Sequence, residues 1–287
     1  MNEFIDSMPH QKWHRIEMCW YCDLTPASAW RICNSHDPEF ECCDELARIA
    51  SEFEQALQDQ GMLPPPLRVT DLWDHQASAF AFSMVRDGVL LNHWMGLGKS
   101  LVAVSLLVNK GCKKTLVLCP TAVRGVWRRE MRKWSAKPVE VLVLDKKSWT
   151  VPKKAAETQK FLELCEANNL PCVVVINYES AWLAAFEKLA LSVQWDAVVC
   201  DESHRIKNPQ AKVSKFIAKL TPINRFRLCL SGTPLTHSPL DIYSQARFLD
   251  PGVFGTSWGR FRDRYAITGS LGQDHIVGYK NQAELSR

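Results

Sequence analysis

Residues 88–108 read GVLLNHWMGLGKSLVAVSLLV, and this stretch decides the fold. It begins with an apolar run typical of a buried strand, passes through a glycine-rich turn at 95–100, and continues as an apolar helix. Such a turn suits a phosphate group, because glycines let backbone N–H groups approach the oxyanion and a helix N-terminus favours negative charge. The stretch therefore predicts a strand, a phosphate-binding loop and a helix.

The loop carries two further groups that phosphate chemistry uses. Lys99 can reach the β and γ phosphates of a nucleotide, and Ser100 can ligate Mg²⁺. A strict phosphate loop, GxxxxGK[ST], has its first glycine at the position that His93 occupies here, so only the second half of the pattern is present. The other interpretation is that the two glycines of the turn serve packing alone.

Five further apolar runs follow the loop, and each is separated from the next by a segment long enough for a helix. They lie at 115–120, 139–145, 172–178, 197–202 and 225–232. Short buried strands that alternate with helices indicate a parallel sheet covered on both faces. We therefore predict an α/β fold.

Two of these runs end in polar groups. Asp201 and Glu202 close the run at 197–202, at the edge of a parallel sheet where ligands bind. Asp201 can hold Mg²⁺, and Glu202 can orient and deprotonate an attacking water. Paired acids after a strand are often a solvated turn, but here they serve the same chemistry as the loop upstream. The turn SGTP at 231–234 has a plain alternative, since Gly and Pro explain a turn by themselves.

Charge divides the chain near a proline-rich connector, GMLPPP, at 61–66. Residues 1–66 carry 4 Lys and Arg against 12 Asp and Glu, whereas the rest carries 31 against 19. We expect two units, 1–66 and 67–287, the first of which includes an amphipathic helix over 46–60. The basic excess of the second unit points to a polyanion, although a solvated face explains it equally well.

The acidic unit contains cysteines at spacings that suit a metal. Four thiolates can close a tetrahedral zinc site, and a small unit with few apolar residues would need such a link to fold. The candidate ligands are Cys19, Cys22, Cys33 and Cys42, with Cys43 or His36 as substitutes for the last. The alternative is a set of free structural cysteines.

Composition limits the class of protein. With 287 residues, 46% hydrophobic and 23% charged, the chain is neither disordered nor collagen-like. Six of its 11 cysteines stand singly in apolar runs, where a reduced thiol behaves as a small hydrophobe. This pattern is typical of proteins in a reducing compartment. No run approaches the roughly 18 apolar residues of a membrane span, and the N-terminus has no signal segment. We expect an intracellular protein without membrane contact, in the cytoplasm of a bacterium or phage-infected cell, or in a eukaryotic nucleus.

Together these motifs resemble the superfamily 2 nucleic-acid translocases, and within them the Swi/Snf-type double-stranded DNA translocase ATPases. The resemblance runs over 67–287. It rests on LWDHQ (72–76), MGLGKS (95–100), LVLCPTAVRGVWRRE (116–130), VINYES (175–180), WDAVVCDESHRIKN (195–208), LSGTPL (230–235) and DIYSQARFLDPGVFG (241–255). The stretches 248–266 and 277–285 are similar to the annealing-helicase and phage branch. The resemblance implies the first RecA-like lobe of a phosphate-loop NTPase, preceded by the cysteine-rich module.

The resemblance also implies a role for the residues of each motif. Gln76 would read the adenine. The triphosphate and Mg²⁺ would be bound by Gly96, Leu97, Gly98, Lys99 and Ser100. Asp201 and Glu202 would form the metal and water-activating pair. Nucleotide state would be coupled to DNA by His204, Ser231, Gly232, Thr233 and Pro234.

The family's DNA-backbone contacts map to two of the strand ends. They fall on Pro120, Thr121, Arg124, Asn177 and Tyr178, with Trp127 nearby. Such groups position a backbone phosphate without reading a base. A tryptophan on an amphipathic helix is usually core, however, and Arg124 could be an exposed helix cation.

The chain departs from the family pattern in two places. His93 and Trp94 stand where the family has acidic residues, and the chain ends at Arg287, where the family's second RecA-like lobe begins. That lobe supplies an arginine finger worth about 10³–10⁵ in rate, so we expect weak or no turnover from this lobe alone.

The sequence therefore predicts the ATP-binding lobe of an ATP-dependent double-stranded DNA translocase, with ATP and Mg²⁺ as cofactors and DNA and a second lobe as partners. Two alternatives stay open. One is a non-catalytic, nucleotide-dependent module that binds DNA or a protein partner. The other is a phosphate-loop enzyme that acts on a small molecule.

Overall fold

A computed structural model describes residues 12–14, 19–21, 43–48, 50–51, 72–135, 138–221, 224–235, 238–269 and 276–285. The chain forms two compact units, Met1–Val85 and Arg86–Arg287. In the first unit, β1 (Lys12–His14) pairs antiparallel with β2 (Cys19–Tyr21), residues 44–48 and 50–51 are helical, and α4 spans Asp74–Met84. The predicted domain boundary lies outside the described residues and stays a prediction, as does most of the helix expected over 46–60.

The predicted zinc site also falls largely outside the described residues. Cys22, Cys33, Cys42 and His36 are among the residues left undescribed, and only the backbone of Cys19 is described, in β2. Cys43 is exposed. Within the described ranges, no group of three or more His, Cys, Asp or Glu side chains could hold a metal.

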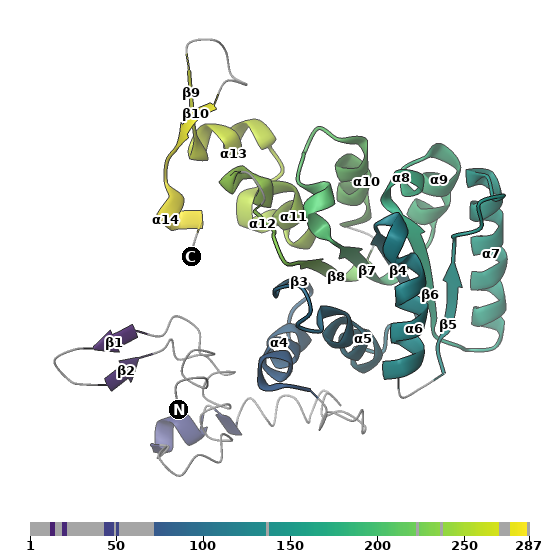
Figure 1. Cartoon of the computed structure of the whole chain (residues 1–287), viewed down its shortest axis with the longest axis horizontal. Helices are drawn as coiled ribbons and strands as arrows, with labels where there is room; N and C mark the ends of the chain where they lie inside the picture. Colours follow the sequence, from purple (N-terminus) through teal and green to yellow (C-terminus); the bar gives the residue numbers. More distant parts are fainter. Residues whose placement is uncertain are drawn as a thin grey trace. The chain divides into compact units, whose positions relative to one another are not determined.

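The second unit is built on a six-stranded parallel sheet, which confirms the predicted α/β fold (Figure 1). The strand order is β3-β8-β7-β4-β6-β5. The strands are β3 (Gly88–Asn92), β4 (Lys114–Cys119), β5 (Glu140–Val143), β6 (Cys172–Asn177), β7 (Trp195–Asp201) and β8 (Asn224–Ser231). Each of the six predicted apolar runs overlaps one of them.

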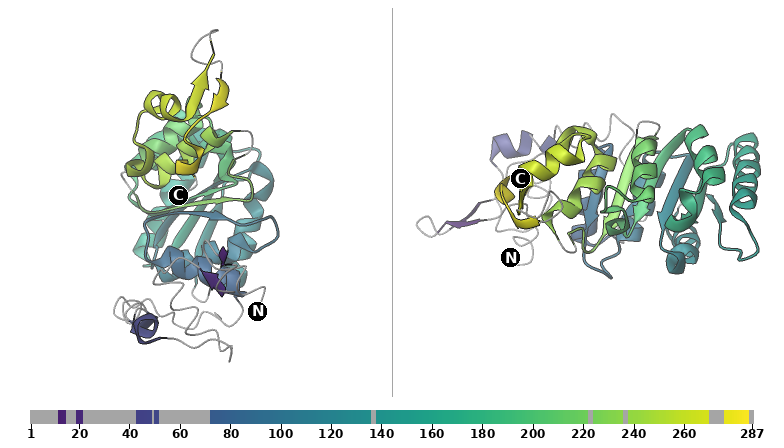
Figure 2. Two further views of the ribbon diagram at one scale, coloured as in Figure 1. Left: turned by 90° about the vertical axis from the view of Figure 1, so that its left-hand side faces the viewer. Right: turned by 90° about the horizontal axis from the view of Figure 1, so that it is seen from above.

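Helices connect the strands and cover both faces of the sheet (Figures 1 and 2). They are α5 (Lys99–Asn109), η2 (Thr121–Val123), α6 (Arg124–Trp134), α7 (Val151–Ala167), α8 (Tyr178–Ala181), α9 (Ala184–Ser192), η3 (Ser203–Ile206), α10 (Lys212–Leu220), η5 (Pro239–Asp241) and α11 (Ile242–Leu249). In the left view of Figure 2, the blue α5 and the green helices lie on opposite faces. No helix in the described part of the chain is long and apolar enough to cross a membrane.

The central strands are continuous apolar runs because both faces of the sheet are buried. In β4, Leu116 and Leu118 pack in one cluster with Leu162 of α7, Phe186 of α9 and other helix residues. Val117, between them, is also fully buried. Alternate residues of one strand thus contribute to two separate cores.

The C-terminal elements form a small aromatic cluster of their own. They are α12 (Pro251–Phe254), α13 (Trp258–Tyr265), the antiparallel strands β9 (Ala266–Thr268) and β10 (Ile276–Tyr279), and α14 (Gln282–Leu285). Tyr243 of α11 packs against Phe261, their ring centroids 4.9 Å apart. Tyr265 joins the same cluster, so these segments pack on the end of α11.

Strand register gathers the candidate residues at one edge of the sheet. Asn92, which ends β3, pairs with Ser231, which ends β8. Asp201, at the end of β7, pairs with Leu230 of β8. Asn177, at the end of β6, pairs with the last residue of β4. The phosphate loop, the acid pair and the SGTP turn therefore all begin at the carboxyl edge.

Candidate functional site

The phosphate loop needs its glycines for backbone conformation. Gly96 has φ 89° and Gly98 has φ 73°, both in the left-handed region that favours glycine. Gly98 is the residue before the first turn of α5. The Lys99 ammonium donates to the backbone oxygens of His93 at 2.8 Å and Trp94 at 3.3 Å. The lysine thus folds over the loop that the sequence predicted, at the N-terminus of a helix.

Asp201 is held by two aromatic residues. The indole N–H of Trp127 donates to Asp201 Oδ2 at 2.9 Å, and the Tyr178 hydroxyl donates to the Asp201 backbone oxygen at 2.8 Å. Burial raises the pKa of Asp201, while the Trp127 hydrogen bond and the nearby Lys99 charge lower it. The indole thus orients a carboxylate, and carboxylate and hydroxyl oxygens are ligands that suit Mg²⁺.

Glu202 has a backbone conformation that its residue type rarely adopts. Its φ and ψ are 53° and 55°. In the part of the chain that the structure describes, the other non-glycine residues with positive φ are Asn169 and Asn281, of a type that tolerates this region. Such a conformation costs about 1–3 kcal/mol and persists only where the surroundings enforce it. Nδ1 of His204 lies 3.3 Å from Glu202 Oε2, so the structure brings these two predicted residues together.

The SGTP turn lies against the phosphate loop. A Cβ atom on Gly232 would meet the His93 backbone oxygen at 3.3 Å and the Met95 backbone nitrogen at 3.4 Å. Ser231 is fully buried, and its hydroxyl accepts the Thr233 N–H at 3.1 Å. Glycine at this turn is therefore explained by close approach to the loop, which is more than a plain turn requires.

The predicted DNA contacts lie at the ends of neighbouring strands. Arg124 begins α6, and its guanidinium donates to the Leu144 backbone oxygen at 2.6 Å and lies 3.5 Å from the Asn177 side-chain oxygen. Thr121 is exposed in η2, directly after Pro120. The remaining basic residues of α6 are Arg128, Arg129, Arg132 and Lys133, against the single acid Glu130.

Two predicted residues have surroundings that the sequence did not indicate. Tyr178 is buried, with its hydroxyl directed at the backbone of Asp201. Trp127 is also buried, as expected if it belongs to the core, yet its N–H donates to Asp201.

The side-chain oxygen of Gln76, in α4 of the first unit, accepts the Trp73 N–H at 3.0 Å. Its contact with adenine stays a prediction.

Sequence reasoning missed Gln245. It is fully buried in α11 and bonded to both Ser203 and Pro234. Its spacing could have revealed it. Gln245 lies three positions before Phe248 and four before Leu249, which are both buried, so it occupies the face of an amphipathic helix that points into the core.

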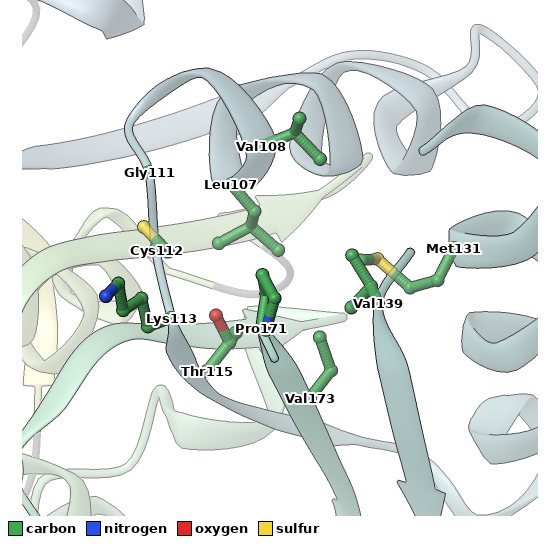
Figure 3. Close-up of a pocket in the computed structure, with 10 residues that line it drawn as sticks. All are labelled: Leu107, Val108, Gly111, Cys112, Lys113, Thr115, Met131, Val139, Pro171 and Val173. Atoms are coloured by element: carbon green, nitrogen blue, oxygen red, sulfur yellow. The ribbon is translucent and has the colours of Figure 1, made fainter. Parts of the chain in front are cut away.

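The amino edge of the sheet carries a different feature. A cavity of about 180 Å³ lies there (Figure 3), and its lining residues are Leu107, Val108, Gly111, Cys112, Lys113, Thr115, Met131, Val139, Pro171 and Val173. In Figure 3 the Lys113 ammonium points away from the apolar side chains. Burial raises the pKa of the Cys112 thiol to about 12. The thiol is therefore protonated at neutral pH and behaves as a small hydrophobe.

Comparison with known proteins places these features among related chains. A model of the SNF2-related domain matches residues 35–285. The SWI/SNF-related matrix-associated actin-dependent regulator of chromatin subfamily A-like protein 1 homolog of Caenorhabditis elegans is 27% identical over 212 residues, which are 73% of this chain and 28% of the relative. The DNA repair and recombination protein RAD54 of Oryza sativa is 30% identical over 215 residues, 70% of this chain and 21% of that protein.

Among solved structures, the Sulfolobus solfataricus SWI2/SNF2 ATPase core in complex with dsDNA is similar, with a TM-score of 0.56 and 25% identity. The similarity covers 71% of this chain and 40% of that one. The same ATPase core domain in a second structure has a TM-score of 0.53. The chain covers under a third of the length of the Caenorhabditis elegans and Oryza sativa relatives.

Proposed function

The chain belongs to the SNF2-related domain family, and from that premise we propose that it is the ATP-binding lobe of a motor that tracks along double-stranded DNA. The observation that carries the proposal is the meeting of the phosphate loop, the acid pair and the SGTP turn at one sheet edge, with Gly232 against the loop. A small-molecule enzyme would need the loop and an acid, but not this turn.

In this proposal each residue of the nucleotide site has one task. The N–H groups of residues 96–98 bind the phosphates, and Lys99 exchanges its two backbone carbonyls for phosphate oxygens. Ser100 and Asp201 would hold Mg²⁺, which would supply positive charge beside the phosphates. Glu202 orients and deprotonates the attacking water, and its enforced backbone conformation supports that role.

The DNA backbone is the proposed partner of the neighbouring strand ends. Arg124, which begins the helix α6 that follows β4 and η2, lies beside Asn177, which ends β6, and Thr121 is exposed in η2. Cations, hydroxyl groups and amide groups at strand ends bind phosphates without reading bases. The basic face of α6 adds a favourable field for a polyanion.

The proposed motor needs a second RecA-like lobe for full turnover. An arginine finger from such a lobe contributes about 10³–10⁵ in rate in related phosphoryl transfer. His204 beside Glu202, and Gly232 beside the phosphate loop, are the proposed coupling points. Turnover by this chain alone is then slow, and closure of the two lobes around ATP drives stepping along DNA.

The test is ATP turnover by the 287-residue chain, with and without double-stranded DNA, against Lys99→Ala. The same assay is repeated with an added second lobe from a relative. We expect DNA-stimulated turnover that needs Lys99 and rises on adding the lobe. If no condition gives turnover but ATP alters DNA affinity, the chain is instead a non-catalytic, nucleotide-dependent module. If DNA has no effect on turnover or on nucleotide affinity, the DNA proposal is wrong.

We also propose the structural zinc site in the first unit, on the spacing of Cys19, Cys22, Cys33 and Cys42 alone. Metal analysis of the full chain is expected to give one equivalent of zinc, and Cys19→Ser is expected to lose it. Less than one equivalent, or full retention in Cys19→Ser, would contradict the site.

A further inference from the structure

Gln245 joins three segments at the carboxyl edge of the sheet. Its side-chain oxygen accepts the Ser203 hydroxyl at 2.6 Å. Its side-chain nitrogen donates to the backbone oxygens of Pro234 at 2.9 Å and Asp241 at 3.1 Å. Gln245 and Ser203 are both fully buried. Because both N–H groups and the oxygen of the amide have partners, its orientation is determined by the protein.

The Ser203 bond acts directly on the loop of Glu202. Ser203 follows Glu202 and begins η3, so a bond from its side chain restrains the backbone at the strained residue. The residue that follows this short helix is also held from α11, because the Ser244 hydroxyl donates to the Lys207 backbone oxygen at 3.2 Å. The Ser244 bond lies four residues further from Glu202 along the chain. Of these two bonds from α11, the one made by Gln245 therefore acts nearest the water-activating acid.

The Pro234 bond acts on the other segment. Pro234 ends the SGTP turn, whose Gly232 approaches the backbone of the phosphate loop. A chain of contacts therefore runs from the phosphate loop through Gly232 and Pro234 to Gln245, and from there to Ser203. In a close-packed interior such contacts shift together. The route connects the phosphate loop to the backbone next to Glu202.

We propose that Gln245 is a positioning residue that sets Glu202 according to the state of the phosphate loop. The inference rests on the proposed function, since it assigns Gln245 to the same ATP site. Gln245 touches no reacting group; it acts through Ser203 on one side and Pro234 on the other. Its loss leaves nucleotide binding intact and lowers the rate of the chemical step.

The experiment uses five variants of the full chain with the second lobe present: three single variants at Gln245 and Ser203, one double variant and one control. Gln245→Met keeps the length of the side chain and removes all three hydrogen bonds. Ser203→Ala removes only the hydrogen bond between Ser203 and Gln245, and Ser203→Thr keeps a hydroxyl that can form it. Nucleotide affinity is measured by titration, and kcat and KM for ATP by turnover, each normalised to the folded fraction.

We expect Gln245→Met and Ser203→Ala each to lower kcat about 10- to 100-fold, as loss of a buried hydrogen bond in a fully formed site implies. The double variant that combines Gln245→Met with Ser203→Ala should be no slower than Gln245→Met alone, because the two residues act as one unit. Ser203→Thr should recover most of the rate. The matched control is Ser244→Ala, which removes a bond between the same two helices and should stay near wild type.

Amide hydrogen exchange gives a readout that does not depend on turnover. Gln245→Met should speed exchange at both 202–206 and 231–235, whereas Ser203→Ala should affect 202–206 alone. If the wild type binds no nucleotide, the proposed function fails, while exchange still decides whether Gln245 links the two segments. If the wild type turns over and Gln245→Met keeps kcat within about twofold, or exchange at either segment is unchanged, the positioning role is wrong.

Discussion

The two edges of the sheet are made by the same strands but carry different kinds of residue. At the carboxyl edge, strands end in polar groups and lead into loops with left-handed residues, among them Gly98 and Glu202. At the amino edge, strands begin around an apolar cavity of about 180 Å³, with Met131 and Val173 in its lining. The amino edge also has left-handed residues, Gly111 and Asn169, but their residue types tolerate that region, whereas Glu202 at the carboxyl edge does not. The backbone that opposes its residue type therefore lies beside the candidate site.

Burial acts on a titratable group at each edge, with different results. It raises the pKa of both Cys112 at the amino edge and Asp201 at the carboxyl edge. Nearby charges oppose burial at both edges: Arg225 and Lys110 lower the pKa of Cys112, and the Trp127 hydrogen bond and the Lys99 charge lower that of Asp201. The difference lies in the hydrogen bond: Asp201 has a buried donor in Trp127, whereas the Cys112 thiol is neutral at neutral pH.

The largest expected effect is that of Lys99→Ala at the carboxyl edge. Its ammonium is the charge that folds over the phosphate loop, so its removal should abolish nucleotide binding while the fold stays intact. Titration with a fluorescent ATP analogue in Mg²⁺ measures binding, and thermal unfolding serves as the control. Nucleotide affinity equal to wild type would mean that the loop does not bind phosphate.

The next effect is that of Glu202→Gln, which keeps the shape of the side chain and removes the base. Turnover in the presence of DNA and the second lobe should fall by about 10²–10⁴. Nucleotide affinity should remain, because the glutamate acts on water. Single-turnover kinetics separate the two quantities, and retained turnover would refute the assignment of water activation to Glu202.

Met131→Ala tests the opposite edge. Met131 is 2% exposed and lines the cavity, so truncation should cost about 2–5 kcal/mol in the free energy of unfolding. Urea denaturation measures this loss. Nucleotide affinity, measured on the folded variant well below the unfolding midpoint, should match wild type. A large loss of affinity would remove the distinction between the edges.

The smallest effect is expected from Trp127→Phe, which keeps a buried ring and removes the indole N–H. Loss of a hydrogen bond to a charged group should cost about 1–3 kcal/mol, and Mg²⁺-dependent nucleotide binding should weaken because Asp201 is no longer oriented. Titration at several Mg²⁺ concentrations measures this weakening. Trp134→Phe is the matched control, since its N–H bonds to Glu130 in the same helix.

The parallel sheet and the site motifs could be predicted because their signals are local. Apolar runs mark each strand, and a sheet with parallel strands brings every strand end to one edge. The bond between Trp127 and Asp201 joins residues 74 positions apart, and that between Ser203 and Gln245 spans 42. Such contacts depend on how helices pack across the sheet, which spacing along the chain does not encode.

The strain at Glu202 and the burial of Tyr178 were likewise hidden from the sequence. Glutamate carries no preference for a left-handed backbone, so only the surrounding loop reveals it. Tyr178 follows a strand end that suggested a surface contact, but its hydroxyl points at Asp201. By contrast, Gly232 could be noticed from its motif, and the structure adds the reason, which is the approach to Met95.

The most direct test of the central claim is the affinity of the 287-residue chain for Mg²⁺ and ATP, measured in one series for wild type, Lys99→Ala and Met131→Ala, with and without double-stranded DNA. The account predicts binding by wild type and by Met131→Ala, a change of that affinity when DNA is added, and no binding by Lys99→Ala. Equal binding by Lys99→Ala would contradict the account, because the nucleotide would then not occupy the carboxyl edge.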